Sequence, residues 1–435
     1  MKTRFEILVV GAGPAGIAAA VTAAECGRSV GLVDDNPVAG GQIWRSGGHL
    51  PEAARRWIAR LERSSVERLQ GWRVFDAPER GVLRAERNRA VSGDAAELRF
   101  EKLILATGAR ERFLPFPGWT LPNVMGAGGL DAMVRGGLPI EGKRVVVAGT
   151  GPLLLAVAAH LAERGARILA ICEQASRRQM LPLAAEVARQ PGKLMQGAQY
   201  RWTTRRSPYR MSCRPVAAVG EARLQSVVLE QNGKRWIVEC DYLACGFHLV
   251  PNTELAELLG CQLEDGFVAT DDFLQTSVES VSCAGEPTEI GGVELAVVEG
   301  QIAALAACGR IDAARRLVRE RRRGQGFVRA LRGACSLSPQ MREVATDETV
   351  VCRCEDVRVG SLRGRTGWRD AKLHTRCGMG PCQGRICGGA VEYLFGWRAD
   401  SVRPPIFPSL VSSLGGSGAR IKDSHSISDQ TKETV

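Results

Sequence analysis

The sequence has few of several residue types and patterns, and each shortage argues against a class of function. Its five histidines, at positions 49, 160, 248, 374 and 425, form no grouping of a general base with a nucleophile. No apolar run reaches the length of a membrane span. The first apolar stretch begins so early that it leaves no room for a signal peptide. We therefore expect a cytoplasmic protein without a membrane span and name no catalytic residue.

Aromatic residues make up only 5% of the 435 residues, which bears on the excess of basic charge. Nine arginines and two acidic residues lie between Arg310 and Arg332, and they supply seven of the eleven net positive charges. Phe327 is the only aromatic residue among them, so the segment lacks a stacking platform for nucleic acid. We expect no nucleic-acid partner. A solvated helix and a docking surface for an acidic protein partner both stay open.

The length and the cysteine count limit what the chain can be. A soluble chain of 435 residues with 45% hydrophobic residues is long enough for two or three domains with cores of their own. Fourteen cysteines without an export signal predict reduced thiols, or metal ligands where they cluster.

The first 34 residues contain a complete dinucleotide-binding pattern. An apolar strand ends in glycines spaced G-x-G-x-x-G, and an Ala-rich helix and a second strand follow. Gly11 makes the strand-to-helix turn, and Gly13 lets the backbone approach a pyrophosphate at the helix N-terminus. Gly16 allows close helix packing, and Asp34 can accept hydrogen bonds from a ribose. These features predict an adenine-dinucleotide site.

Three later glycine-bearing segments extend this prediction. Positions 40–44 hold adjacent glycines that permit close backbone approach to a cofactor. A buried strand over 103–105 ends in Ala-Thr-Gly, and another over 281–284 ends in Gly285-Glu286 before a glycine pair and a long helix. Between the first two segments we expect a helix over 51–69 and short strands near 72–74, 82–85 and 98–100.

A second strand–glycine–helix–strand arrangement begins near position 144 and predicts an internal repeat of the fold. The repeat departs from the first copy. Leu154 replaces the third glycine, and the spacing that reaches Asp34 in the first copy reaches Cys172 here, with Glu173 one position late. A nicotinamide site stays open, because the arginines at 177 and 178 could bind a 2′-phosphate.

Five of the fourteen cysteines fall within 36 residues, spaced C-x-C, 27 residues, then C-x4-C, with Cys377 in between. Clustered thiolates in a reducing compartment bind soft metals or iron–sulfur clusters. Structural zinc sites usually pair ligands at C-x2–4-C spacing, and three nearby arginines would favour an anionic 2Fe–2S cluster. We expect Cys352, Cys354, Cys382 and Cys387 as ligands and Cys377 as an ordinary apolar residue. Zinc and unmetallated thiols are the alternatives.

The chain combines a dinucleotide-binding pattern with a C-terminal cysteine cluster. In this combination the sequence resembles the alpha-type FAD and 2Fe–2S subunits of heteromeric bacterial amine dehydrogenases. This group includes hydrogen cyanide synthase, opine oxidase, and D-hydroxyproline and L-proline dehydrogenases. The C-terminal part resembles the small BFD-like ferredoxin domain. The resemblance covers about residues 4–400. The motifs that carry it lie at 11–16, 40–44, 106–112, 149–154, 285–287, 291–296 and 375–385.

The resemblance implies an α/β fold with two Rossmann-like dinucleotide-binding domains, the second inserted in the first, and a C-terminal 2Fe–2S domain. The expected limits are 1–118 and 266–309 for the FAD-binding domain, 119–265 for the NAD(P)-type domain, 310–345 for an Arg-rich helical linker, 346–400 for the BFD-like domain, and 401–435 for a tail with a disordered end. The expected cofactor-binding residues are Gly11, Gly13, Pro14, Ala15, Gly16, Asp34, Gly41, Gln42, Thr107, Gly108, Gly285 and Glu286.

The implied function is to relay electrons from oxidation of an amino or imino acid CH–NH bond, through FAD and the cluster. D-Hydroxyproline, proline, an opine or glycine would be oxidised by a separate amine oxidase-like flavoprotein subunit, with an optional small third subunit. One alternative is a stand-alone NAD(P)H-dependent flavoprotein reductase. Another is a non-enzymatic iron- or redox-sensing scaffold. The sequence has no C-x-x-C beside a flavin motif, so disulfide reduction is unsupported.

Overall fold

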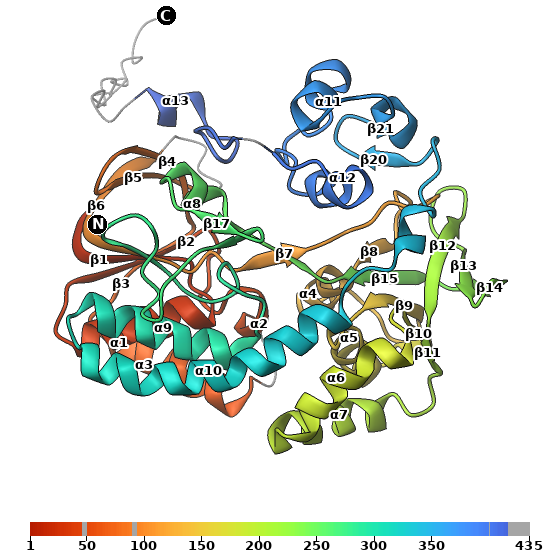
Figure 1. Cartoon of the computed structure of the whole chain (residues 1–435), viewed down its shortest axis with the longest axis horizontal. Helices are drawn as coiled ribbons and strands as arrows, with labels where there is room; N and C mark the ends of the chain where they lie inside the picture. The colour runs from red at the N-terminus through yellow and green to blue at the C-terminus, as the bar shows by residue number, and fades with distance from the viewer. Residues whose placement is uncertain (46–49, 89–93, 400, 416–435) are drawn as a thin grey trace, which may run out of the picture.

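The computed structural model describes residues 1–45, 50–88, 94–399 and 401–415 (Figure 1). Two sheets with central parallel strands form two α/β units that lie side by side, and a small unit from the C-terminal part lies next to the second (Figure 1). The expectation of a disordered end concerns residues 416–435, which lie outside the described part of the chain. Among the described helices, none has the length and apolar character of a membrane span.

The first sheet is organised around β1 (Arg4–Val10), which pairs in parallel with strands on both sides. Its alternate side chains enter two cores, one beneath the long helices and one beneath the segment around residue 255, so the strand is apolar over most of its length. The other elements of this unit are β2 (Val30–Asp34), β3 (Glu67–Gln70), β4 (Trp72–Glu79), β5 (Val82–Arg87), β6 (Ala95–Leu105), β19 (Val281–Cys283), α1 (Pro14–Glu25), α2 (Gly41–Trp44), α3 (Glu52–Arg63), α8 (Glu254–Leu258), β17 (Leu263–Glu264), β18 (Phe267–Val268), α9 (Val293–Ala307) and α10 (Ile311–Ala334).

Two expectations for this unit are wrong in detail. The helix expected over 51–69 ends at Arg63, and β3 follows it as a parallel strand beside β2. Leu69 is buried in that strand, so pairing and burial override the helical spacing of the segment. The strands expected at 98–100 and 103–105 are one continuous strand, β6.

The second sheet has the order β11-β10-β9-β15-β8 and repeats the parallel core of the first. Its central strand β9 (Arg144–Thr150) pairs in parallel with β10 and β15. A separate antiparallel sheet, β12-β13-β14, forms the meander at the outer edge of this unit (Figure 1). The remaining elements are β8 (Val124–Gly126), α4 (Ala127–Arg135), α5 (Leu153–Glu163), β10 (Arg167–Glu173), α6 (Arg177–Ala188), α7 (Pro191–Thr203), β11 (Tyr209–Met211), β12 (Cys213–Val219), β13 (Ser226–Gln231), β14 (Lys234–Glu239) and β15 (Tyr242–Phe247).

The chain leaves the first unit and returns to it along one antiparallel pair, β7 (Ala109–Glu111) with β16 (Leu249–Pro251). Strand β19 then pairs with β6 of the first sheet. The second sheet therefore lies, in sequence, between two parts of the first unit.

The C-terminal unit has a core of its own that includes three of its cysteines. Its elements are η1 (Pro339–Arg342), β20 (Val350–Cys352), β21 (Val357–Arg358), η2 (Val359–Leu362), α11 (Trp368–Thr375) and α12 (Cys387–Phe395), and α13 (Val411–Leu414) follows. The segment after α12 returns to the first unit, where Ile406 is buried and Phe407 packs beside it.

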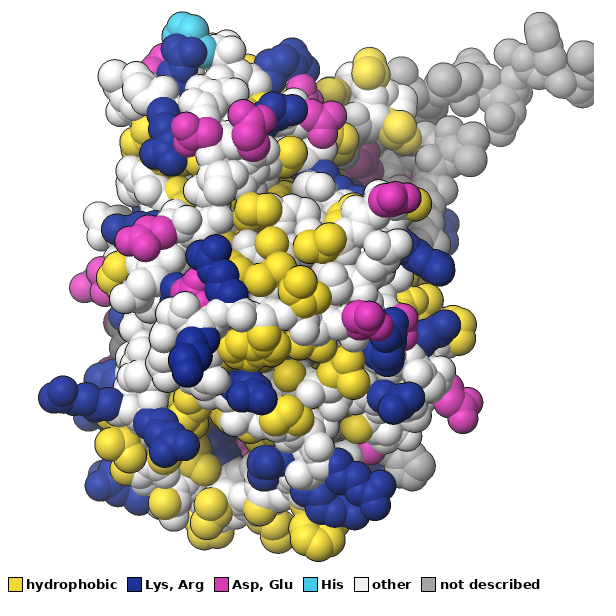
Figure 2. Space-filling model, turned by 90° about the vertical axis from the view of Figure 1, so that its right-hand side faces the viewer, with side chains coloured by type: hydrophobic (Ala, Val, Ile, Leu, Met, Phe, Trp, Pro, Cys, Tyr) yellow, Lys and Arg dark blue, Asp and Glu magenta, His cyan; other side chains and the backbone are white. Residues whose placement is uncertain are grey.

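Figure 2 shows the face formed by the right-hand side of Figure 1, with the C-terminal unit at the top. Lys and Arg side chains are spread over its lower half, together with apolar side chains. Large apolar side chains that are exposed on α6 and α7 include Leu181, Leu194, Met195 and Trp202.

Candidate functional site

A cavity of about 370 Å³ opens at the carboxyl ends of β1, β2 and β6. This is the edge where open α/β sheets bind their ligands. Eleven of the twelve sequence-predicted cofactor residues line it: Gly11, Gly13, Pro14, Ala15, Asp34, Gly41, Gln42, Thr107, Gly108, Gly285 and Glu286. The twelfth, Gly16, lies behind the turn in the helix that the turn leads into.

The glycine-rich turn is closed by contacts that only glycine allows. A Cβ atom on Gly11, whose φ is +104°, would lie 2.2 Å from the Ala106 carbonyl oxygen. A Cβ on Gly16 would lie 1.7 Å from the Gly11 carbonyl oxygen. Helix α1 therefore starts directly at the turn, with its N-terminus toward the cavity, as an anionic pyrophosphate requires.

Asp34 is fixed by the backbone around it. Its Oδ2 accepts a hydrogen bond from the Ala12 N–H at 2.6 Å, and its Oδ1 accepts from the Asn36 N–H at 2.8 Å. The carboxylate is thus held at the cavity edge with acceptor capacity left for ribose hydroxyl groups.

A buried ion pair supports the Gly285 turn, and the sequence pattern carries no signal of it. Glu299 of α9 accepts hydrogen bonds from the Gly285 N–H at 2.8 Å and from the Thr288 hydroxyl at 3.0 Å. Its other oxygen pairs with the Arg321 guanidinium of α10 at 2.8 Å, and both side chains are buried. Arg321 of the basic segment 310–332 therefore has a structural role in the core. Neither interpretation of that segment, as a solvated helix or as a docking surface, included such a role.

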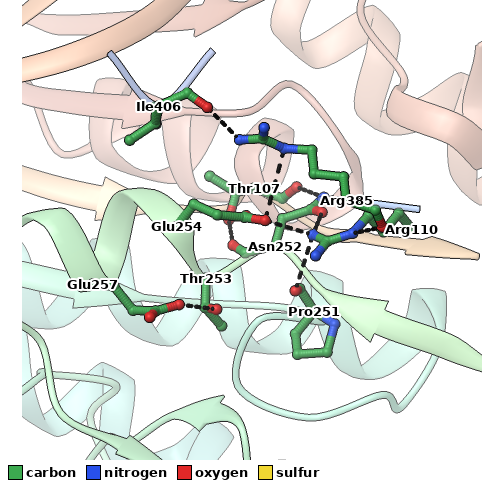
Figure 3. Close-up of polar contacts among 9 residues, drawn as sticks. All are labelled: Thr107, Arg110, Pro251, Asn252, Thr253, Glu254, Glu257, Arg385 and Ile406. Atoms are coloured by element: carbon green, nitrogen blue, oxygen red, sulfur yellow. Dashed lines mark hydrogen bonds and ion pairs between the residues drawn. The ribbon is translucent and has the colours of Figure 1, made fainter. Parts of the chain in front are cut away.

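A cluster of polar residues joins the cavity to the C-terminal unit (Figure 3). Arg110 Nη1 donates to Asn252 Oδ1 at 2.7 Å and lies 2.9 Å from Glu254 Oε1, while its Nε donates to the Arg385 carbonyl oxygen at 3.1 Å. Arg385 Nη2 donates to the Ile406 carbonyl oxygen at 2.7 Å. Its Nε lies 3.7 Å from Glu254 Oε1, so both arginines share one carboxylate.

Arg385 belongs to the C-terminal unit and also lines the cavity. It lies in the turn between Cys382 and Cys387, and its guanidinium stacks on the Phe407 ring at 3.9 Å. The sequence shows Arg385 beside the cysteines, but nothing in its pattern indicates that this side chain reaches the dinucleotide cavity.

Three of the five clustered cysteines converge. The sulfur atoms of Cys352, Cys377 and Cys387 lie within 4.8 Å of one another, and all three residues are buried. Hydrogen bonds from the Cys377 and Cys387 thiols hold the pKa of Cys352 well below its ordinary value. Cys377, which we expect to be an ordinary apolar residue, is buried in the core of this unit, and its thiol also lies among the candidate ligands, so its role stays a prediction.

The other two cysteines lie nearer the surface and beside each other. Partial burial raises the pKa of the Cys354 thiol, the Cys382 N–H opposes that rise, and the Cys382 thiol adds to it. A Cβ on Gly380 would lie 2.2 Å from Cys354 Cβ, so the glycine-bearing loop closes directly over this cysteine. The loop thus brings C-x-C and C-x4-C segments together from distant positions in the sequence.

The second glycine-rich turn has an acidic residue at the place of Asp34 after all. A β-bulge between Ile168 and Ala170 takes up one residue, so that Glu173 lies opposite Gly149 in the strand register. Glu173 Oε2 accepts from the Gly151 N–H at 2.7 Å, which resembles the contact of Asp34 with Ala12. The sequence count that reached Cys172 missed this, because it assumed a regular strand.

Comparisons with known proteins place this geometry among flavoproteins. The family model described as pyridine nucleotide-disulphide oxidoreductase matches residues 5–303. An opine oxidase subunit of Rhizobium meliloti (strain 1021) is 33% identical over 93% of this chain and 97% of its own length. Hydrogen cyanide synthase subunit HcnB of Pseudomonas aeruginosa is 30% identical over 88% of this chain and 90% of its own length. The solved L-proline dehydrogenase from P. horikoshii has a TM-score of 0.67 at 17% identity, covering 94% of this chain and 79% of that one.

Proposed function

The chain belongs to the pyridine nucleotide-disulphide oxidoreductase family, and on that premise we propose that it is the FAD-dependent, electron-transferring subunit of a heteromeric dehydrogenase. Relatives that match almost its whole length are named as subunits of an opine oxidase and a hydrogen cyanide synthase. The substrate we propose is an amino or imino acid of the D-hydroxyproline, proline, opine or glycine type. An amine oxidase-like flavoprotein subunit, with an optional small third subunit, would oxidise its CH–NH bond.

FAD supplies hydride and single-electron chemistry when it is bound, and the chain's own residues position it. The glycine turn and the N-terminus of α1 would hold the pyrophosphate, and Asp34 would hold the adenosine ribose. Gly285 and Glu286, supported by the buried Glu299–Arg321 pair, would contact the ribityl chain.

A 2Fe–2S cluster fits the cysteines of the C-terminal unit. Convergent sulfur atoms, burial and a loop closed over Cys354 form a set of soft thiolate donors. We keep Cys352, Cys354, Cys382 and Cys387 as the proposed ligands, with Cys377 as the competing candidate. The cluster would pass single electrons onward from the flavin.

The proposed electron relay is supported by the position of Arg385. This residue lies between the proposed cluster ligands Cys382 and Cys387 and forms part of the wall of the dinucleotide cavity. The turn that would hold the cluster and the cavity that would hold the flavin therefore share a residue. We accordingly propose a C-terminal cluster domain over 346–400 that is joined to a FAD domain over 1–118 and 266–309. The second unit over 119–265, the linker over 310–345 and the tail over 401–435 complete the proposed division.

The relay is tested on the full chain purified without oxygen. We expect about one FAD and two iron atoms per chain. Photoreduction of the flavin should be followed by the appearance of the reduced-cluster electron paramagnetic resonance signal. Arg385→Gln should slow this step, whereas Arg363→Gln, which removes an exposed partner of Asp347, should not. A chain with neither a yellow chromophore nor iron contradicts the proposal.

The ligand set is tested by two serine variants. Cys387→Ser should abolish the visible iron–sulfur absorbance, and Cys377→Ser should leave it intact. Because Cys377 lies beside Cys352 and Cys387, the reverse result would make Cys377 a ligand. Zinc in place of iron, found by elemental analysis, would overturn the cluster assignment itself.

Two other functions have distinct outcomes. Flavin bleaching of the isolated chain by NADPH within seconds would favour a stand-alone NAD(P)H-dependent reductase. A chain that stays colourless after anaerobic reconstitution would favour a non-enzymatic scaffold for iron or redox sensing.

A further inference from the structure

The two dinucleotide folds of this chain differ in what lies over their glycine turns. At the first turn, Asp34 lines an open cavity. At the second turn, Glu173 occupies the corresponding place but is fully buried, with its oxygens bound to the N–H groups of Gly151 and Ala175. The second turn is covered by another segment of the same chain.

The cover is the segment 333–338, which comprises the last two residues of α10 and the four residues after it. Cys335 is only 3% exposed. Its Sγ lies 2.6 Å from the position that a Cβ on Gly151 would take. In an open dinucleotide fold this space, above the glycine turn and the start of the next helix, holds the pyrophosphate. Here a thiol side chain fills it.

Two glutamines of the second unit hold the segment in place. Gln174 donates to the Ser336 carbonyl oxygen at 3.0 Å and accepts from the Ser338 N–H at 3.0 Å. Gln179 donates to the Ser336 carbonyl oxygen at 2.9 Å. Gln174 follows directly after β10, and Gln179 lies in the first turn of α6, where the adenosine half of a nicotinamide dinucleotide would lie.

The segment is also tied to the C-terminal unit. The Tyr393 hydroxyl of α12 donates to the Ser338 carbonyl oxygen at 2.5 Å, and Arg342 donates to the Tyr393 carbonyl oxygen at 3.0 Å. The peptide groups of Ser338 thus join the edge of the second sheet to the unit that carries the cysteines.

We propose that residues 333–338 are a built-in plug of the second dinucleotide site, and that this plug determines donor specificity by excluding NADH and NADPH. This inference rests on the proposed function. It means that electrons enter this chain from the reduced flavin of a partner protein and not from a nicotinamide. The glycine turn of the second fold then serves as the anchor for the linker to the C-terminal unit. The arginines at 177 and 178 are exposed outside the plug.

The first test measures nucleotide binding and thiol protection on the full chain. NADPH and ADP-ribose should give no binding heat with the wild-type protein, and Cys335 should be alkylated by iodoacetamide only after unfolding, as followed by peptide mass spectrometry. Gln174→Ala/Gln179→Ala should speed alkylation of Cys335 at least about tenfold by local opening. Gln196→Ala, a glutamine of the same unit that contacts Tyr200 instead, should leave it unchanged.

The second test measures the contact itself and needs no cofactor. Gly151→Ala should lower Tm, both through its φ of +94° and through collision with Cys335. Cys335→Ala in addition should restore part of that loss, because only the collision depends on the thiol. Strictly additive Tm changes, micromolar binding of NADPH by the wild type, or rapid alkylation of native Cys335 would each overturn the proposal. These outcomes are independent of flavin and iron content, on which the proposed function depends.

Discussion

Glu286 lines the dinucleotide cavity, and the pKa of its carboxyl group differs strongly from that of a free glutamate side chain. Burial in the cavity wall raises the pKa of its carboxyl group from 4.5 to about 7. Glutamate carries its carboxyl group one methylene further from the backbone than aspartate would. The protonated form can donate a hydrogen bond to a ribityl hydroxyl, whereas the ionised form can only accept.

We predict that Glu286 makes the stability of the flavin-free protein depend on pH. The folded chain binds this proton more tightly than the unfolded chain does, so the free energy of unfolding falls as pH rises from 4.5 to about 7 and is constant above that range. Glu286→Gln should remove this decline, as measured by urea unfolding across the pH range. Glu221→Gln, at an exposed position, should keep it. Equal pH profiles for wild type and Glu286→Gln would contradict the prediction.

At the scale of elements, the long helices are fitted to the sheet by small residues and one buried ion pair. A Cβ on Gly300 of α9 would lie 2.1 Å from the Ala15 carbonyl oxygen of α1, so the two helices pack at backbone contact. The α10 helix is packed on α9 through Arg321, whose partner Glu299 also holds the Gly285 turn. Helix packing and the shape of the cofactor site are therefore coupled.

We predict that Arg321→Met destabilises the fold by about 3–5 kcal/mol, because it leaves the Glu299 carboxylate buried without its counter-charge. The neighbouring Arg322→Met should cost at most about 1 kcal/mol, since Arg322 pairs with Asp272 at the surface. Chemical unfolding of both variants measures the difference. Because Glu299 also holds the Gly285 turn, Glu299→Met is measured alone and together with Arg321→Met: the double variant should cost less than the sum of the two single variants, and additive costs would show that the buried pair is not the cause.

At the scale of the whole molecule, the dinucleotide cavity is completed by residues from far along the chain. Phe407, beyond the C-terminal unit, lines the cavity and stacks on Arg385 at 3.9 Å and on Arg73 at 5.2 Å. Of the segment expected as a tail over 401–435, the residues Val402, Ile406 and Phe407 pack in the core of the first unit.

We predict that Phe407→Ala raises the dissociation constant of FAD roughly tenfold, the effect of losing an aromatic wall and a cation–π contact of about 1 kcal/mol or more. Quenching of flavin fluorescence on binding measures it. Trp202→Ala, which removes an exposed aromatic side chain on α7, is the matched control and should leave the affinity unchanged. An unchanged affinity in Phe407→Ala would show that the tail does not contribute to the site.

The sequence by itself determined the two dinucleotide folds, eleven cavity-lining positions and the cysteine-rich unit, because turns, strand ends and ligand spacings are set by residues close together in the chain. Only the tertiary structure decided where Cys377 lies, that a bulge brings Glu173 into the acidic position, and that Arg385 and Phe407 reach the first cavity. It also decided that residues 333–338 cover the second glycine turn. Each of these depends on contacts between segments far apart in sequence or on one irregular strand, and neither leaves a periodic signal in the amino-acid pattern.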